Sequence, residues 1–278
     1  MKRAEFELPV EGARLSSVVR WRDGQRSEVD DWLTEEVPVA FEFNGISHAV
    51  MLATPADLED FALGFGLSEA IFASAADLYG CDVNSSAQGI TISMEVSARS
   101  FAGLKDRRRT LAGRTGCGVC GTESLDQVLR PVPLVAESAP VHSAAIARAM
   151  REMNDQQRLC RATGSVHAAA WCNPQGQVLL LREDVGRHNA LDKLVGALAR
   201  SGSARGDGFI AVTSRASVEM VQKAAVAGAP LLAAVSAPTA LAVETAHRAG
   251  MGLVGLARGD NLVVYAHPER VVLGAREN

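Results

Sequence analysis

The sequence predicts an α/β protein in which a small N-terminal α+β domain precedes a larger α/β domain. In the first half, strand-like segments flank the dipeptide Asn44-Gly45, which is a strong signal for a two-residue β-hairpin. From His142 onward, short apolar segments alternate with amphipathic helical ones. That alternation is typical of a largely parallel sheet covered by helices on both faces. We place the predicted domains at residues 1–140 and 141–278.

In the N-terminal domain the hairpin signal and later alternation define the strands. The predicted strands are Val37–Phe43, Ile46–Leu52 and Ile90–Val96. A helix is expected to open at Thr54-Pro55-Ala56-Asp57 and to run to about Phe72. Thr54 can cap this helix, Pro55 suits its first turn, and Asp57 occupies the capping-box position. From Phe101 to about Pro140 the regular patterning weakens, so we expect a long loop and a connector, which in a compact domain is often functional.

In the C-terminal domain the period of the apolar residues switches repeatedly between helical and strand-like. The predicted helices are His142–Leu159, Asn189–Arg200, Ala216–Ala227 and Thr239–Ala249. The predicted strands are Val166–Cys172, Val178–Arg182, Phe209–Thr213, Leu231–Val235, Gly252–Ala257 and Leu262–Ala266.

The bulk composition limits the class of protein. The chain has 278 residues, a net charge of -4 and an isoelectric point of about 5.9, which argue against a general nucleic-acid binder. No apolar run approaches the roughly 18 residues that a membrane-spanning helix needs, and the N-terminus does not resemble a signal peptide. We therefore expect a cytoplasmic protein without membrane contact. The odd count of five cysteines also argues against a disulfide framework.

The strongest chemical feature is the segment from Gly113 to Gly121, in which Cys117 and Cys120 lie among four glycines. Such a segment has little side-chain bulk and wide backbone freedom, so we expect a flexible loop that presents a thiol to large partners. Basic residues precede the two cysteines: Arg99, Lys105, Arg107, Arg108, Arg109 and Arg114. Nearby cations favour the thiolate, which is the nucleophilic form of cysteine. This chemistry favours sulfur transfer or redox transfer.

A zinc site is the main alternative for the same cysteines. A CxxC pair supplies half of the four ligands of a structural zinc, and Cys160, His167 and Cys172 offer further ligands, although their spacing matches no common zinc pattern. Thioredoxin-like chemistry would place the pair at a helix start directly after a strand. A zinc deaminase would need His-x-Glu before Pro-Cys-x-x-Cys, whereas His267-Pro268-Glu269 follows the pair.

Polar turns follow four predicted strands of the C-terminal domain. These turns are Glu183–Asn189, Ser214–Ser217, Ser236–Thr239 and Arg258–Asn261. In open α/β sheets, ligands bind beyond the carboxyl ends of the strands, and helix N-termini there attract phosphate. The turns therefore predict a site for an anionic ligand such as a nucleotide or pyrophosphate. The candidate residues are Arg187, His188, Ser214, Arg215, Ser236, Thr239 and Arg258. As an alternative, Ser214, Ser236 and Asn189 simply cap the helices that follow them.

Several blocks of the sequence together resemble the formate dehydrogenase accessory sulfurtransferases, the FdhD family. The cysteine segment Gly113–Gly121 carries the resemblance most clearly. The other blocks are Glu35–Val39, Asn44–His48, His167–Trp171, Glu183–Lys193, Ser214–Ser217 and Ser236–Thr239. They are spread in order over most of the chain and are together far more specific than one CxxC pair.

The resemblance implies a fold, a function and partners. It implies a cytidine-deaminase-like C-terminal α/β domain without the deaminase zinc, a homodimer, and no tightly bound metal. It further implies a sulfurtransferase that takes sulfur from a cysteine desulfurase and passes it to the bis-molybdopterin guanine dinucleotide cofactor of formate dehydrogenase. Cys117 matches the persulfide-carrying cysteine and Cys120 its companion. The cofactor-binding stretch falls on Leu256, Ala257, Arg258, Gly259, Asp260 and Asn261.

Two other classes remain open from the sequence. One is a chaperone that holds the molybdenum cofactor but moves no sulfur. The other is a nucleotide-binding protein stabilised by zinc, which would hold about one tightly bound zinc per chain.

Overall fold

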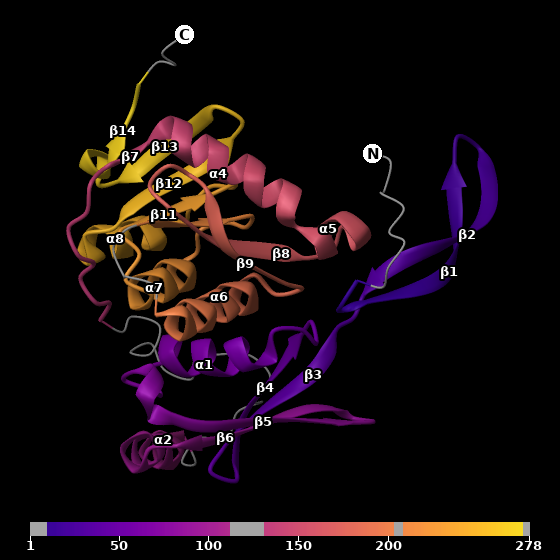
Figure 1. Cartoon of the computed structure of the whole chain (residues 1–278), viewed down its shortest axis with the longest axis vertical. Helices are drawn as coiled ribbons and strands as arrows, with labels where there is room; N and C mark the ends of the chain where they lie inside the picture. The colour runs from indigo at the N-terminus through magenta and orange to yellow at the C-terminus, as the bar shows by residue number, and fades with distance from the viewer. Residues whose placement is uncertain (1–9, 112–130, 203–207, 275–278) are drawn as a thin grey trace.

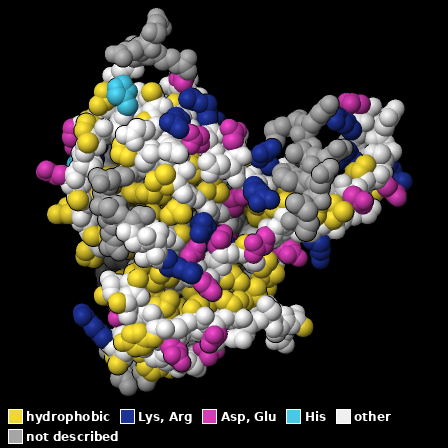
Figure 2. Space-filling model, in the orientation of Figure 1, with side chains coloured by type: hydrophobic (Ala, Val, Ile, Leu, Met, Phe, Trp, Pro, Cys, Tyr) yellow, Lys and Arg dark blue, Asp and Glu magenta, His cyan; other side chains and the backbone are white. Residues whose placement is uncertain are grey.

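The computed structural model describes residues 10–111, 131–202 and 208–274, with the backbone alone of residues 105–111. Its N-terminal part begins with a ribbon that stands off the body of the molecule (Figure 1; space-filling view in Figure 2). The ribbon pairs β1 (Ala13–Arg22) with β2 (Gln25–Thr34) in antiparallel register. Its turn residues Asp23 and Gly24 have φ values of 51° and 78°, and such left-handed conformations are typical of a two-residue hairpin turn. This ribbon was not predicted from the sequence.

The rest of the N-terminal part is a four-stranded sheet with a helix on its inner face. The strand order is β4 (Ile46–Ala53), β3 (Val37–Phe43), β6 (Gly89–Val96) and β5 (Leu78–Ser86). The predicted hairpin at Asn44-Gly45 is confirmed, since β3 and β4 pair in antiparallel register around it. β5 was not predicted. It follows the short 3-10 helix η1 (Ala75–Asp77).

The helix after β4 is shorter than predicted. α1 spans Leu58–Ser68, with Asp57 at its N-cap position, so Thr54 does not cap it. Thr54 is instead buried, because its backbone N–H donates to Asp184 Oδ2 (3.0 Å) and its hydroxyl accepts from the N–H of Val185 (3.2 Å). These contacts hold Thr54 away from the helix axis and delay the start of the helix.

The region predicted as an irregular loop begins as a helix. α2 spans Ala98–Leu111, so the prediction was wrong for its first part. Residues 131–140 form an extended connector, and the Val135 N–H donates to the Ala249 carbonyl (2.9 Å). The connector leads to β7 (Val141–His142), which pairs with β14 (Val271–Val272).

The C-terminal part alternates helices and strands nearly as predicted. Its helices are α4 (Ser143–Gln156), α5 (Arg158–Thr163), α6 (Arg187–Ser201), α7 (Val218–Val226), α8 (Ala240–Ala249) and the short η2 (Pro268–Arg270). Its main sheet has the order β13 (Asn261–Ala266), β12 (Gly252–Arg258), β11 (Leu231–Ala234), β10 (Phe209–Val212), β8 (His167–Cys172) and β9 (Val178–Asp184).

This sheet is mixed, so the prediction of a largely parallel sheet was wrong. The pairs β10–β11 and β11–β12 are parallel, whereas β8–β9, β8–β10 and β12–β13 are antiparallel. The reason is the short connections from β8 to β9 and from β12 to β13, because only antiparallel neighbours can be joined without a long crossover.

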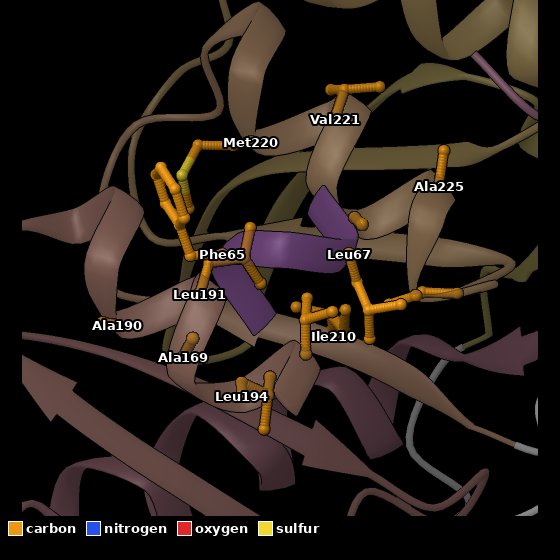
Figure 3. Close-up of a cluster of buried hydrophobic side chains, with 14 of the residues drawn as sticks. Phe65, Leu67, Ala169, Ala190, Leu191, Leu194, Ile210, Met220, Val221 and Ala225 are labelled. Atoms are coloured by element: carbon orange, nitrogen blue, oxygen red, sulfur yellow. The ribbon is translucent and has the colours of Figure 1, made fainter. Parts of the chain in front are cut away.

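Helices cover both faces of the mixed sheet. On one face, α4 residues such as Ile146 and Met153 pack against Ala170 and Phe209. On the other face, one hydrophobic core joins the two parts of the chain: Phe65 and Leu67 of α1 lie among side chains of α6, α7 and β10 (Figure 3). α1 thus lies between α6 and the four-stranded sheet (Figure 1).

α1 and α6 approach closely through a pair of glycines. A Cβ atom on Gly64 would lie 1.7 Å from the carbonyl oxygen of Asp192, and one on Gly196 would lie 1.9 Å from that of Asp60. Neither position has room for a side chain. This contact places α1 directly against the middle of α6, whose N-terminus belongs to the candidate site.

None of the helices in the described ranges is both long and apolar enough to cross a membrane.

Candidate functional site at the carboxyl edge of the mixed sheet

The predicted polar turns meet at one edge of the mixed sheet, which we call the carboxyl edge. β9, β10, β11 and β12 run in one direction, so their carboxyl ends lie there. β8 runs in the opposite direction, and its first residue, His167, pairs with Asp184 at the end of β9. The structure therefore places His167 at the same edge as the turns that bear Arg187, Arg215 and Arg258.

Arg187 is the first residue of α6, directly after the N-cap residue Gly186. Its Nε atom is buried and has no hydrogen-bond partner among the described residues. A buried donor without a partner is costly and is unusual in native proteins. The arrangement is therefore suited to an acceptor supplied by a ligand, such as a phosphate oxygen at a helix N-terminus.

A buried ion pair holds the turn that carries Arg187. The Asp184 carboxylate accepts from Lys193 Nζ (2.6 Å), the Gly186 N–H (2.8 Å) and Asn189 Nδ2 (2.9 Å). Lys193 also donates to the Thr54 carbonyl (2.9 Å), so the turn is tied to the end of β4. Asn189 thus serves this network and does not cap α6.

His188 faces a carboxylate of the next helix. His188 Nε2 lies 2.9 Å from Glu219 Oε2 and 3.5 Å from Ser217 Oγ. The hydrogen bond with His188 holds the pKa of Glu219 below its usual value. Because both contacts use the same ring nitrogen, the three residues do not form a hydrolytic triad, in which serine and carboxylate bond opposite nitrogens.

His167 is half-buried next to these groups. Its Nδ1 lies 3.5 Å from Thr213 Oγ1. Burial, and then the nearby charges of Arg187 and His188, lower the pKa of His167. His167 is therefore neutral at pH 7 and adds a polar ring to the edge without adding charge.

The turns after β10 and β11 differ in what their side chains do. Ser214 is buried and donates to the Arg215 carbonyl (3.0 Å), so it does not cap α7. Thr239 does cap α8, because its hydroxyl accepts from the Ala242 N–H (3.3 Å). The carbonyl oxygen of Ser236 accepts from the Leu256 N–H (3.3 Å), which joins the turn after β11 to β12. The capping alternative is therefore wrong for Ser214 and Ser236, because Ser217 and Thr239 are the N-cap residues of α7 and α8.

The stretch from Leu256 to Asn261 forms an irregular end of the β12–β13 hairpin. The register shifts between Gly255 and Arg258, and Leu256 has a φ of 53° although it is not glycine. Such strained positions concentrate at functional sites, and bulges are frequent beside them. Leu256 is exposed, whereas Ala257 is buried in the core beneath.

The charged residues of this stretch are held by neighbours. Arg258 Nε donates to the Val235 carbonyl (3.1 Å), which keeps it beside the turn after β11. Asp260, whose carboxylate would repel a phosphate, lies 3.5 Å from Arg151 of α4, and both side chains are exposed. Gly259 has a φ of 58° and Asn261 pairs with Arg258 across the turn.

Cys117 and Cys120 lie outside the described residues. The other three cysteines lack the lowered thiol pKa that a cysteine nucleophile needs. Burial raises the pKa of Cys81 to about 11 and that of Cys172 to about 12, and it also raises that of Cys160. Cys172 is buried in the core under α4 and Cys160 packs against a smaller cluster at the base of the ribbon. These three thiols are therefore protonated at neutral pH.

Sequence reasoning missed the roles of Asp184, Lys193 and Glu219. Asp184 and Lys193 lie nine residues apart. Two opposite charges in an otherwise apolar part of the sequence were the signal that could have indicated a buried ion pair. Glu219 lies in the first turn of α7, where acidic residues are common for reasons of the helix dipole, so nothing in the sequence distinguished it.

The fold and the edge define a class: an α/β protein with a mixed sheet whose carboxyl edge gathers arginines, histidines and helix N-termini. Comparison with known proteins gives the family. The model of the FdhD/NarQ family matches residues 34–272, and the chain belongs to this family, which confirms the resemblance inferred from the sequence.

Individual relatives agree with this assignment. The chain is 57% identical over 264 residues to the sulfur carrier protein FdhD of Variovorax paradoxus (strain S110), covering 95% of this chain and 92% of the relative. It is 56% identical over 255 residues to the protein of that name from Cupriavidus necator, covering 92% and 88%. A crystal structure of a candidate formate dehydrogenase accessory protein from Desulfotalea psychrophila superimposes with a TM-score of 0.74 at 26% identity, covering 94% of this chain and 99% of that one.

Proposed function

We propose that this protein is a sulfurtransferase that carries sulfur for formate dehydrogenase. The observation that carries the proposal is the 57% identity to a protein named as a sulfur carrier, together with the Cys117–Cys120 pair in its glycine-rich segment. The donor is a cysteine desulfurase and the acceptor is the molybdenum cofactor, a bis-molybdopterin guanine dinucleotide, before its insertion into formate dehydrogenase.

The sulfur would move in two exchanges. The Cys117 thiolate attacks the terminal sulfur of the desulfurase persulfide, so that the donor leaves as a thiolate and Cys117 becomes a persulfide. The Cys120 thiolate then attacks the Cys117 sulfur, a Cys117–Cys120 disulfide forms, and hydrosulfide leaves for the molybdenum centre. A cellular thiol must reduce the disulfide before the next cycle.

The cofactor would be held at the carboxyl edge by its nucleotide tails. The unpartnered Nε of Arg187 offers a donor to a phosphate oxygen, and Arg215 is exposed after the end of β10 at the same edge. The irregular stretch Leu256–Asn261 borders the same edge and corresponds to the cofactor-binding stretch implied by the family resemblance. The edge supports the proposal because arginine side chains and helix N-termini are the kinds of donor that bind phosphate groups.

Three further expectations belong to the same proposal. They are a cytidine-deaminase-like layout of the C-terminal part, a homodimer, and a cytoplasmic location. The alternative function is a chaperone that binds the cofactor without moving sulfur, and it is favoured only by the anion-binding features of the edge, which do not require the cysteines.

Intact-protein mass spectrometry after incubation with a cysteine desulfurase and cysteine, without reductant, tests the proposal. We expect a gain of about one sulfur atom, lost in Cys117→Ala and kept in Cys120→Ala and in the control Cys81→Ala. Formate dehydrogenase activation should fall with Cys117→Ala. If the wild-type protein gains no sulfur from an active desulfurase, or if Cys117→Ala activates fully, the chaperone alternative holds.

A further inference from the structure

An acidic side chain lies inside the cationic edge, and the proposed function does not use it. Glu219, in the first turn of α7, reaches across to α6 and places Oε2 2.9 Å from His188 Nε2. Its side chain remains 55% exposed, so a ligand bound at the edge would meet it. The hydrogen bond from His188, and then the charges of His188, Lys223 and Arg187, lower the pKa of Glu219. It is therefore a carboxylate at neutral pH.

Among the described residues, Lys223 is a further cation whose charge acts on Glu219, but its hydrogen bonds go to other groups. Lys223, one helical turn later, is buried and donates to Asp192 (2.8 Å), Glu69 (3.1 Å) and Ser68 (3.0 Å). Its charge is already matched by those carboxylates. Lys223 therefore acts on Glu219 only through its charge, whereas the ion pair of Glu219 is made with His188 at the carboxyl edge.

The first two residues of α6 therefore differ in whether their side chains have a partner within the protein. Arg187 has a buried donor without a partner, whereas its neighbour His188 already faces a carboxylate. An anion that approaches Arg187 is attracted by the guanidinium and repelled by Glu219. Because the Coulomb energy is proportional to the ligand charge, the repulsion increases with each further negative charge on the ligand.

We propose that Glu219 is a specificity-determining residue that makes the carboxyl edge favour a pyrophosphate diester over nucleotides with a free terminal phosphate. This inference rests on the proposed function, in which the ligand is a dinucleotide whose phosphates are both esterified. Such a diester carries a charge of about -2, whereas a nucleoside triphosphate carries about -4 at neutral pH. The carboxylate thereby reduces competition from free nucleotides that share the same base.

The alternative role for Glu219 is to orient His188. Substitution by glutamine separates the two roles, since the amide keeps a hydrogen bond to the imidazole and removes the charge. Glu219→Asp keeps the charge. Glu95, exposed on β6 of the other sheet, provides the matched control Glu95→Gln, which removes one negative charge away from the edge.

The test is isothermal titration of the full-length protein, at low salt and without Mg²⁺, with GDP-mannose, GDP and GTP. We expect Glu219→Gln to bind all three more tightly, with a gain that grows with ligand charge. A gain of about 3-fold for the diester implies about 9-fold for GTP, since doubling the charge squares the factor. Glu219→Asp and Glu95→Gln should keep the wild-type order of affinities, and 0.5 M salt should reduce the effect of Glu219→Gln.

An equal change for the three ligands, or no change, would overturn the role of Glu219 while leaving the nucleotide site intact. Weaker binding of all three would assign Glu219 to the orientation of His188 and overturn the inference. If the wild-type protein binds none of the three ligands, both this inference and the nucleotide part of the proposed function are wrong, whereas the sulfur-loading experiment on Cys117 is unaffected.

Discussion

Lys193 Nζ lies 2.6 Å from Asp184 Oδ2, and neither side chain has any exposed surface. This pair joins three parts of the protein, because Asp184 ends β9, Lys193 lies in α6, and both bond to Thr54 after β4. Lys193 also lies 5.6 Å from the centroid of the Phe61 ring of α1. The pair thus positions the turn of Arg187 and His188 relative to the N-terminal sheet.

Removing one member of this pair should strongly destabilise the protein. We expect Lys193→Met to lower the free energy of unfolding by about 3–5 kcal/mol, because it leaves the Asp184 carboxylate buried and unpaired. Urea denaturation followed by circular dichroism measures the change. The double variant Asp184→Asn/Lys193→Met should recover part of the loss.

The control is Arg148→Gln, which breaks an exposed pair with Glu152 and should lower the free energy of unfolding by no more than about 1 kcal/mol. Equal effects of Lys193→Met and Arg148→Gln would contradict this account.

Enlarging a glycine at the contact between α1 and α6 should also destabilise the protein. Gly64→Ala introduces a Cβ atom 1.7 Å from the Asp192 carbonyl oxygen, so the helices must separate, at a cost of about 1–3 kcal/mol or more. The control is Gly103→Ala on α2, where a Cβ atom meets nothing within 4 Å and helix propensity predicts a gain of about 0.5–1 kcal/mol. Opposite shifts in the melting temperature are expected, and shifts of the same sign would show that the close approach is not the determinant.

The stability of the protein should fall in mild acid through His167. Burial and neighbouring cations lower the pKa of His167 from 6.5 in the folded state, so the unfolded chain binds a proton more readily. The stabilisation is present above pH 6.5 and is lost as the pH falls below it. We expect the melting temperature of the wild type to fall more steeply between pH 7.5 and pH 5.5 than that of His167→Gln. Parallel curves would mean that His167 titrates alike in both states.

The five cysteines should differ sharply in reactivity. Cys81 and Cys172 have raised pKa values of about 11 and about 12, and a thiol must ionise before it reacts. In brief alkylation at pH 7.5, peptide mass spectrometry should find label on Cys117 and Cys120 well before Cys81, and none on Cys172 until urea is added. Early labelling of Cys172 in the folded protein would contradict the burial described for β8.

The sequence predicted those parts of the fold that depend on local patterns. The alternation of strands and helices from β8 to β13 was predicted to within a few residues, because each segment carries its own period. The antiparallel pairs were missed although the short Asn173–Gly176 turn indicated them, since it is too short for a crossover. The ribbon also had a local signal in Asp23-Gly24, which marks a hairpin.

Other features depend on residues far apart in the chain. The late start of α1 follows from the bond between Thr54 and Asp184, which are 130 positions apart. The meeting of the polar turns at one edge could be predicted, because it follows from where the strands end. In contrast, the unpartnered Nε of Arg187 and the contact between Glu219 and His188 arise from the packing of α6 against α7. No periodicity in the sequence reports such contacts.

Substitution of Arg187 should weaken ligand binding without lowering the stability of the protein. Its Nε is buried without a partner among the described residues, so removing it takes away a cost rather than a contact. Arg187→Met should therefore leave the free energy of unfolding within about 1 kcal/mol of the wild type. It should weaken binding of GDP at least about 10-fold, as expected for the loss of one charge-assisted hydrogen bond worth roughly 1.5–3 kcal/mol.

The matched control for Arg187 is Arg182, which is engaged within the protein by Asp57 (3.3 Å) and Asp60 (2.6 Å). Arg182→Met should destabilise the protein, because Asp60 has only 10% of its side chain exposed and loses a close partner, but the surviving folded protein should bind GDP as the wild type does. Titration calorimetry and urea denaturation on the same samples compare the two variants. If Arg187→Met destabilises and Arg182→Met weakens binding, the roles assigned to the two arginines are reversed, and the anion site lies nearer to α1 than to the start of α6.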